Sequence, residues 1–264
     1  MITIFRALAE LEEQGEGGVL CTIIGSQGST PRHEGSKLLL YPDGHFIGSV
    51  GGGEVESRVI KEAAQALLDG KTRLLSYEMI NPQQGDPGVC GGTVEVFVEP
   101  LKPKPTLLVV GGGHVGKAIT HLAHWLGFRV GVSDDRPEFC TPEANPDADF
   151  FVDAPMGEIP AKMAITPYTY IVLPTRNMGV DVQGLPALLD TKAGYIGVIG
   201  SRRRWSLTKK ALGEAGVSAE KINRIYAPMG LELRAETPEE IAVSIMAEII
   251  MLRNGGTGKS MKLT

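Results

Sequence analysis

Two glycine-rich stretches in this sequence are of the kind that binds phosphate groups. The first, VVGGGHVGKA at residues 109–118, contains Gly111-x-Gly113-x-x-Gly116. In dinucleotide-binding loops the first glycine makes a tight turn, the second lets a pyrophosphate approach the backbone, and the third allows a helix to pack closely on a strand. A strand pattern precedes this loop and a helical pattern follows it, so the sequence predicts phosphate binding at a helix N-terminus.

Two polar residues near this loop are candidates for ligand contact. Asp134 ends the next predicted strand, where a carboxylate that binds a ribose belongs. His114 lies inside the loop and is either a hydrogen-bond donor to an anion or a surface residue. The pattern leaves two interpretations open: an NAD(P) site, and a Rossmann scaffold that holds another ligand or none.

The second stretch, IGSVGGGEVES at residues 47–57, places three glycines at the start of a predicted helix. Glycines at a helix start suit a bound anion. Glu54 and Glu56 have a separate explanation, because acidic side chains near a helix N-terminus stabilise the helix without any ligand. The nearby loop GSQGSTPRHEG offers backbone amides, hydroxyl groups and Arg32. Cys90 lies between glycines in GVCGG, where it is either a packed side chain or a thiolate ligand and nucleophile.

Composition and charge exclude several classes of function. The net charge is −5 and no run of basic residues dominates, so we expect no nucleic-acid binding. The sequence shows no signal peptide and no apolar run long enough for a bilayer, which predicts a protein without membrane segments. Its three cysteines are widely spaced and form no disulfide or zinc pattern, which is typical of a protein in a reducing compartment, so we expect a cytoplasmic location.

One apparent nucleotide-binding motif does not hold. GGTGKS at 255–260 is not a P-loop, because Arg253 stands where that motif begins with glycine.

Hydrophobic periodicity divides the chain into two predicted domains. Residues 1–102 combine a helix over 3–14, a strand in GGVLCTIIGS, a hairpin in KLLLYPDGHFIG, a helix after Gly53, and strands in TRLLSYEM and TVEVFVEP. This is an α+β pattern. The proline-rich segment LKPKPT follows as a stiff connection. Residues 103–264 then alternate strands with helices, which predicts a Rossmann-like parallel sheet. In the last helix, Thr237, Pro238 and Glu240 predict a capping box.

Several of these motifs together resemble the xanthine dehydrogenase accessory protein family (XdhC/CoxI). In the first domain they are GSTPRHEGSKLLLYPDGHFIGSVGGGEVE and CGGTVEVFVEP; in the second they are VVGGGHVGKA…VSDDRPEF, GYIGVIGSRRRW and APMGLELRAETPEEIAVSIMAEI. The resemblance covers nearly the whole chain. It implies a factor that binds the molybdenum cofactor, as molybdopterin or its dinucleotide, assists its sulfuration and delivers it to a molybdenum hydroxylase apoenzyme such as xanthine dehydrogenase. A cysteine desulfurase is a further partner that it implies.

The resemblance also implies which residues form the ligand site. Cys90 becomes a contact to molybdenum or sulfur, with a catalytic role. Two loop sets would hold the phosphate groups across a domain cleft. Their predicted members are Ser29, Thr30, Pro31, Arg32, Gly52, Gly53 and Glu56 in the first domain, and Gly111, Gly113, His114, Gly116, Gly200, Ser201 and Arg202 in the second. To these the residues themselves add Asp134, from the glycine-motif pattern, and Arg176, whose positive charge suits phosphate binding.

The sequence departs from the family pattern at two positions. Family members often carry a cysteine where this chain has Glu54, and a histidine where it has Arg176. Both changes favour cofactor binding and delivery over catalysis. Two alternatives remain open: an NAD(P)-dependent oxidoreductase, supported by the glycine motif and Asp134, and a nucleotide-binding sensor. We also expect a homodimer, because IAVSIMAEIIML in the last helix has enough apolar surface to bury a face.

Overall fold

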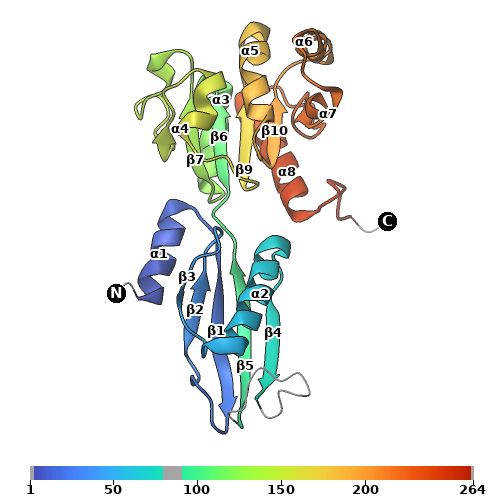
Figure 1. Ribbon diagram of the computed structural model, residues 1–264. Helices are drawn as coiled ribbons and strands as arrows, with labels where there is room; N and C mark the ends of the chain where they lie inside the picture. Colours follow the sequence, from blue (N-terminus) through green and yellow to red (C-terminus); the bar gives the residue numbers. More distant parts are fainter. Residues whose placement is uncertain (1–2, 80–90, 263–264) are drawn as a thin grey trace. The chain divides into compact units, whose positions relative to one another are not determined.

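The computed structural model describes residues 3–79 and 91–262 and divides the chain into two compact units, Met1–Lys104 and Pro105–Thr264. Each unit has its own sheet and hydrophobic core (Figure 1). The fold class expected from the sequence, an α+β unit followed by a Rossmann-like unit with a parallel sheet, is confirmed. Among the described helices, none combines the length and the apolar character needed to cross a membrane.

The first unit is an antiparallel sheet with a helix on each face. Its strands are β1 (Gly18–Gln27), β2 (Lys37–Leu40), β3 (Phe46–Gly48), β4 (Arg73–Glu78) and β5 (Thr93–Leu101), in the spatial order β3-β2-β1-β5-β4. Side chains alternate along β1 and β5, so Val19, Cys21 and Val96 face α2 (Gly53–Asp69). Leu39 points the opposite way and packs against α1 (Ile4–Gln14). Strand periodicity thus gives one sheet two apolar faces.

The second unit is a parallel sheet in the order β11-β10-β9-β6-β7-β8. Its strands are β6 (Thr106–Val110), β7 (Arg129–Ser133), β8 (Phe150–Phe151), β9 (Thr169–Leu173), β10 (Tyr195–Val198) and β11 (Ile225–Tyr226). Numbered within the unit, this is the strand order of dinucleotide-binding Rossmann domains. The chain reverses its direction of winding between β6 and β9, and ligands of such sheets bind at the carboxyl ends of the strands beside that point.

Helices cover both faces of this parallel sheet, which makes three layers. On one face α3 (His114–Trp125) and α8 (Pro238–Asn254) pack on residues such as Leu107 and Val109. On the other, α5 (Met178–Leu189) and α6 (Arg202–Glu214) pack on the alternate residues Leu108 and Val110. Two short helices, α4 (Ile159–Lys162) and α7 (Ala219–Ile222), complete the second layer. The central strands are buried on both sides, which explains why their sequences are continuous apolar runs.

The predicted capping box at the start of α8 is confirmed. The Thr237 hydroxyl accepts a hydrogen bond from the Glu240 amide at 3.2 Å, and the Glu240 carboxylate accepts one from the Thr237 amide at 3.2 Å. This reciprocal pair satisfies amides that the helix itself leaves unpaired.

We predict that Thr237→Ala lowers the free energy of unfolding by about 1 kcal/mol, because an alanine N-cap cannot accept the Glu240 amide. Urea denaturation followed by circular dichroism measures the change. Thr257→Ala is the matched control, since Thr257 is exposed and lies beyond α8. Equal stability of the two variants would contradict the prediction.

Candidate functional site

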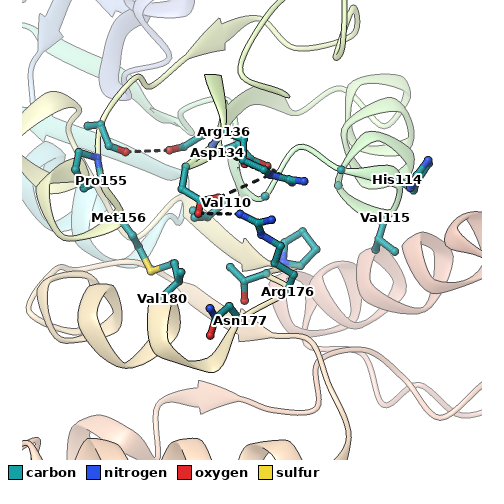
Figure 2. Close-up of a pocket in the computed structure, with 18 residues that line it drawn as sticks. Val110, His114, Val115, Asp134, Arg136, Pro155, Met156, Arg176, Asn177 and Val180 are labelled. Carbon is teal, nitrogen blue, oxygen red and sulfur yellow. Dashed lines mark hydrogen bonds and ion pairs between the residues drawn. The ribbon is translucent and has the colours of Figure 1, made fainter. Parts of the chain in front are cut away.

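A cavity of about 290 Å³ lies at the carboxyl ends of β6, β7, β8 and β9 in the second unit (Figure 2). It is therefore at the reversal point where Rossmann folds bind ligands. It is lined by Val110, Gly111, Gly113, His114, Val115, Gly116, Ser133, Asp134, Asp135, Arg136, Ala154, Pro155, Met156, Pro174, Thr175, Arg176, Asn177 and Val180.

The glycine loop between β6 and α3 forms one wall of the cavity. Gly111 has a φ of 125°, which side-chain-bearing residues rarely adopt. A Cβ on Gly116 would lie 1.8 Å from the Gly111 carbonyl oxygen, so only glycine lets α3 approach the end of β6 this closely. Gly113 caps α3 without any side-chain hydrogen bond, which leaves the first amides of the helix for a ligand.

Asp134 is the buried anchor of the loop. Its carboxylate accepts hydrogen bonds from the Gly112 amide at 2.8 Å and from the Arg136 amide at 2.9 Å. It also forms a two-point ion pair with the Arg136 guanidinium, with both distances at 2.9 Å. Burial alone would raise the pKa of Asp134, but the hydrogen bonds from Arg136 and Gly112 outweigh it and lower the pKa. Its side chain is 1% exposed. Both oxygens are thus engaged within the protein, and the ribose contact expected for Asp134 stays a prediction.

Two arginines line the cavity, and each is paired with an aspartate that lines it too. Arg136 packs over the Phe139 ring at 3.9 Å, and its guanidinium lies near the loop, 3.7 Å from where a Cβ on Gly113 would be. Arg176 follows β9, and its Nη2 lies 3.2 Å from Asp135 Oδ2. His114 is exposed and lies at the edge of Figure 2, away from both arginines. The cavity therefore offers two guanidinium groups beside the amides of α3.

The remaining wall is apolar. It is lined by Val110 at the end of β6, by Pro155 and Met156 at the start of the 3-10 helix that follows β8 (Met156–Glu158), and by Val180 in α5 (Figure 2). A cavity that combines an amide cradle, cationic groups and an apolar wall can hold a phosphate group joined to a planar ring system.

A buried polar network holds the loop after β9. Asp181 in α5 is fully buried and accepts hydrogen bonds from the Thr175 hydroxyl and from Arg204 Nη2, the latter at 2.6 Å. Arg204 in α6 also donates to the Thr175 carbonyl oxygen at 2.8 Å. Because this network ties the loop after β9 to α5 and α6, it fixes the backbone at Thr175, the residue before Arg176.

A second, more open cavity of about 750 Å³ adjoins this network. It is lined by Arg176, Asn177, Met178, Ser201, Arg203, Arg204 and Leu207. Arg176 and Asn177 line both cavities. Ser201 caps α6 by accepting a hydrogen bond from the Arg204 amide at 3.2 Å.

The structure brings together most of the site residues that were predicted in the Rossmann unit. Gly111, Gly113, His114, Gly116, Asp134 and Arg176 all line the first cavity, and Ser201 lines the second. Gly200 and exposed Arg202 flank Ser201 but line neither cavity. Sequence reasoning missed Asp135, Arg136, Asp181 and Arg204. For Arg136 a signal was available, since it lies only two residues after Asp134; the other contacts depend on tertiary packing.

In the first unit the glycine turn is filled by one of its own side chains. Glu56 Oε2 accepts hydrogen bonds from the Ser49 hydroxyl at 2.7 Å, the Val50 amide at 3.0 Å and the Gly52 amide at 3.4 Å. Gly52 and Gly53 have positive φ values of 75° and 59°. Glu56, predicted to form a ligand wall, therefore stabilises the turn in this structure. Glu54 forms an exposed ion pair with Arg58 at 2.9 Å.

Other predicted residues of this unit lie close to that turn. A Cβ on Gly51 would be 3.7 Å from Pro31, and one on Gly92 would be 2.8 Å from the Thr30 side chain. The loop that carries Ser29 and Arg32, both exposed, is thus next to the glycine turn and to the start of β5. Cys90, the predicted catalytic and metal-binding residue, lies outside the described residues.

The two described cysteines are not activated thiols. Cys21 is buried in the core of the first unit, and burial raises its pKa to about 12. Burial also raises the pKa of Cys140, which is partly buried beside the carbonyl oxygens of Val132 and Val152. Neither supplies a thiolate near neutral pH.

We predict that Gly116→Ala destabilises the second unit by about 3 kcal/mol or prevents its folding, because the methyl group collides with the Gly111 carbonyl. Thermal unfolding measures the change. The control is Gly213→Ala in α6, where a Cβ meets no atom within 4 Å; we expect this variant to be at least as stable as the wild type. A stable Gly116→Ala protein would show that the loop tolerates a larger separation from α3.

We predict that Asp134→Asn lowers the free energy of unfolding by about 2 kcal/mol at neutral pH, because it removes charged hydrogen bonds to Arg136 and Gly112. The pKa of Asp134 is lower in the folded protein than its ordinary value of 3.8, so its contribution is complete above that pH and disappears as the pH falls further. Urea denaturation at several pH values should show the two proteins converging in acid. Asp135→Asn, at an exposed neighbour, should differ little from the wild type, and a pH-independent gap for Asp134→Asn would contradict the assignment.

Comparisons with known proteins agree with this geometry. The XdhC Rossmann domain family matches residues 107–249, and the XdhC and CoxI family matches residues 11–78. A Bacillus halodurans structure described as a xanthine dehydrogenase is 23% identical, with a TM-score of 0.52 over 98% of each chain, and shows the same fold.

Three curated relatives are similar over much of the chain. The uncharacterized protein YqeB of Escherichia coli is 37% identical over 98% of this chain and 48% of its own length. A Bacillus subtilis protein, named as a probable xanthine dehydrogenase component, is 34% identical over 61% of this chain and 47% of its own length. The molybdenum cofactor insertion chaperone PaoD of Escherichia coli is 26% identical over 95% of this chain and 88% of its own length.

The chain therefore spans about half the length of the first two of these relatives and most of the third. The family match to the Rossmann unit extends over more than half of the chain, and the strand order and glycine loop are those of such a domain. The chain belongs to the XdhC family.

Proposed function

We propose that this protein is a maturation factor for a molybdenum enzyme, which binds the molybdenum cofactor as cargo and delivers it to the apoenzyme of a molybdenum hydroxylase. The observation that carries the proposal is the first cavity of the Rossmann unit. It places the free amides of α3 beside the guanidinium groups of Arg136 and Arg176 and opposite an apolar wall. The match to PaoD, named as a molybdenum cofactor insertion chaperone, supports the same function.

The residues present fit the non-metal parts of this cargo. A phosphate of molybdopterin, or the pyrophosphate of its dinucleotide form, matches the amides and arginines, and a ring system matches the wall at Pro155 and Met156. Within the described ranges there is no group of three or more metal-binding side chains. Recognition through phosphate and ring therefore agrees with a protein that must release its cargo intact.

We also propose that the protein assists sulfuration of the cofactor, and this step depends on Cys90. Cys21 and Cys140 are both poor candidates because burial raises the pKa of each thiol. We propose that Cys90 contacts the molybdenum or its sulfur ligand and that a cysteine desulfurase supplies the sulfur. The loop that carries Ser29, Thr30 and Arg32 remains the predicted contribution of the first unit to ligand binding, since Glu56 takes the amides of the turn at Gly52.

A second candidate function is NAD(P)-dependent oxidation or reduction, which the strand order and the glycine loop favour. The engagement of both Asp134 oxygens by Arg136 and Gly112 weighs against it, since the usual ribose acceptor is occupied. Titration with NADH, followed by its fluorescence, separates this candidate from the cofactor carrier.

We predict that the protein, expressed in cells that make the molybdenum cofactor, purifies with molybdenum and pterin in a fixed ratio. Arg176→Gln should retain about tenfold less pterin, because it loses a charged hydrogen bond to phosphate. Elemental analysis and pterin fluorescence measure both components. The matched control is Lys210→Gln, which removes the same charge from an exposed position in α6.

Cys90→Ala tests the sulfur step separately. Cofactor that is retained by this variant but fails to activate an apoenzyme would place Cys90 in sulfuration. Absence of pterin from the wild type, together with tight NADH binding, would contradict the proposal of a cofactor carrier and favour an NAD(P)-dependent oxidoreductase.

A further inference from the structure

An ion pair crosses the mouth of the first cavity. Asp135 follows β7 and Arg176 follows β9, and these two strands are the neighbours of β6 on either side. Arg176 Nη2 and Asp135 Oδ2 are 3.2 Å apart, and both residues line the cavity. The pair therefore spans the carboxyl end of β6, where the glycine loop begins, and in Figure 2 Arg176 reaches toward the Asp134–Arg136 group.

Of the two arginines that line the first cavity, Arg176 is the one whose bonding leaves it able to change partner. Arg136 is held by two hydrogen bonds to buried Asp134 and by its contact with the Phe139 ring. Arg204 is held by fully buried Asp181 and by Thr175. By contrast, the side chains of Arg176 and Asp135 are 61% and 50% exposed, and an exposed ion pair is weak.

A ligand phosphate at the glycine loop would compete with Asp135 for the same guanidinium. The Asp135 carboxylate is also the exposed negative charge nearest to that guanidinium, so it repels an anion that enters the cavity. Removing this carboxylate would free Arg176 for phosphate and remove the repulsion at the same time.

We infer that Asp135 is the residue that sets the affinity of this cavity for phosphate-bearing ligands, by holding Arg176 until a ligand displaces it. This inference rests on the proposed function, in which the cavity binds the phosphate part of its cargo. Binding exchanges one partner of Arg176 for another, which makes capture of the cargo reversible. A carrier that must surrender its cargo needs such a moderate affinity.

The test is a double-mutant cycle on the full chain, with inorganic pyrophosphate as the probe, by isothermal titration calorimetry at low ionic strength. We expect Asp135→Asn to bind pyrophosphate about two- to fivefold more tightly than the wild type, and Arg176→Gln to bind it about tenfold more weakly. In the Arg176→Gln background, Asp135→Asn should tighten binding by less than it does in the wild type, because only the repulsion is then removed. Glu138→Gln is the control, since among the described residues Glu138 carries the same charge in the same loop but lines neither cavity and forms no ion pair with Arg176.

Three outcomes overturn the inference while pyrophosphate binding itself persists. Asp135→Asn binds no more tightly than the wild type; Glu138→Gln tightens binding as much as Asp135→Asn does; or Asp135→Asn tightens binding equally when Arg176 is already glutamine. Failure of pyrophosphate to bind to any of these proteins would instead refute phosphate binding in the cavity, and with it the proposed function. Both positions are exposed, so circular dichroism should show native folding for each variant.

Discussion

The candidate site depends on one buried carboxylate. Asp134 ends β7, and its oxygens accept hydrogen bonds from the Gly112 amide and from both the amide and the guanidinium of Arg136. Through these bonds the loop between β6 and α3 is tied to the neighbouring strand. A carboxylate with 1% exposure must be fully paired, because an unpaired buried charge is costly. The geometry of the glycine loop and the position of Arg136 are therefore consequences of the same interaction.

This arrangement gives the cavity an uneven distribution of charge. Arg136 is neutralised and held by Asp134, whereas the Arg176–Asp135 pair is exposed and can be rearranged. The Arg204–Asp181–Thr175 network adds rigidity behind the loop that carries Arg176. In the proposed carrier, an exposed ion pair on a rigid frame would let an anionic cargo exchange with Asp135 at Arg176.

The first unit illustrates a different use of glycine. Positive φ angles at Gly52 and Gly53 form a turn whose amides point at one place, as in an anion site, but the Glu56 carboxylate occupies that place. The same backbone arrangement thus serves internal stabilisation here and leaves amides for a ligand at α3. Whether such a turn binds a ligand is decided by the side chain that follows it, and glycine content alone does not distinguish the two cases.

Features that depend on neighbours in the chain could be predicted from the sequence alone. The Rossmann class, the glycine loop at the N-terminus of α3 and the Thr237 capping box all follow from hydrophobic period and residue type within a few positions. Pairing of charges that lie far apart in the sequence could not be predicted in this way. Asp135 and Arg176 are 41 residues apart, and Arg204 and Asp181 are 23 apart. Only the strand order of the folded sheet brings such residues together, since electrostatic partners are chosen by distance in space and not by distance along the chain.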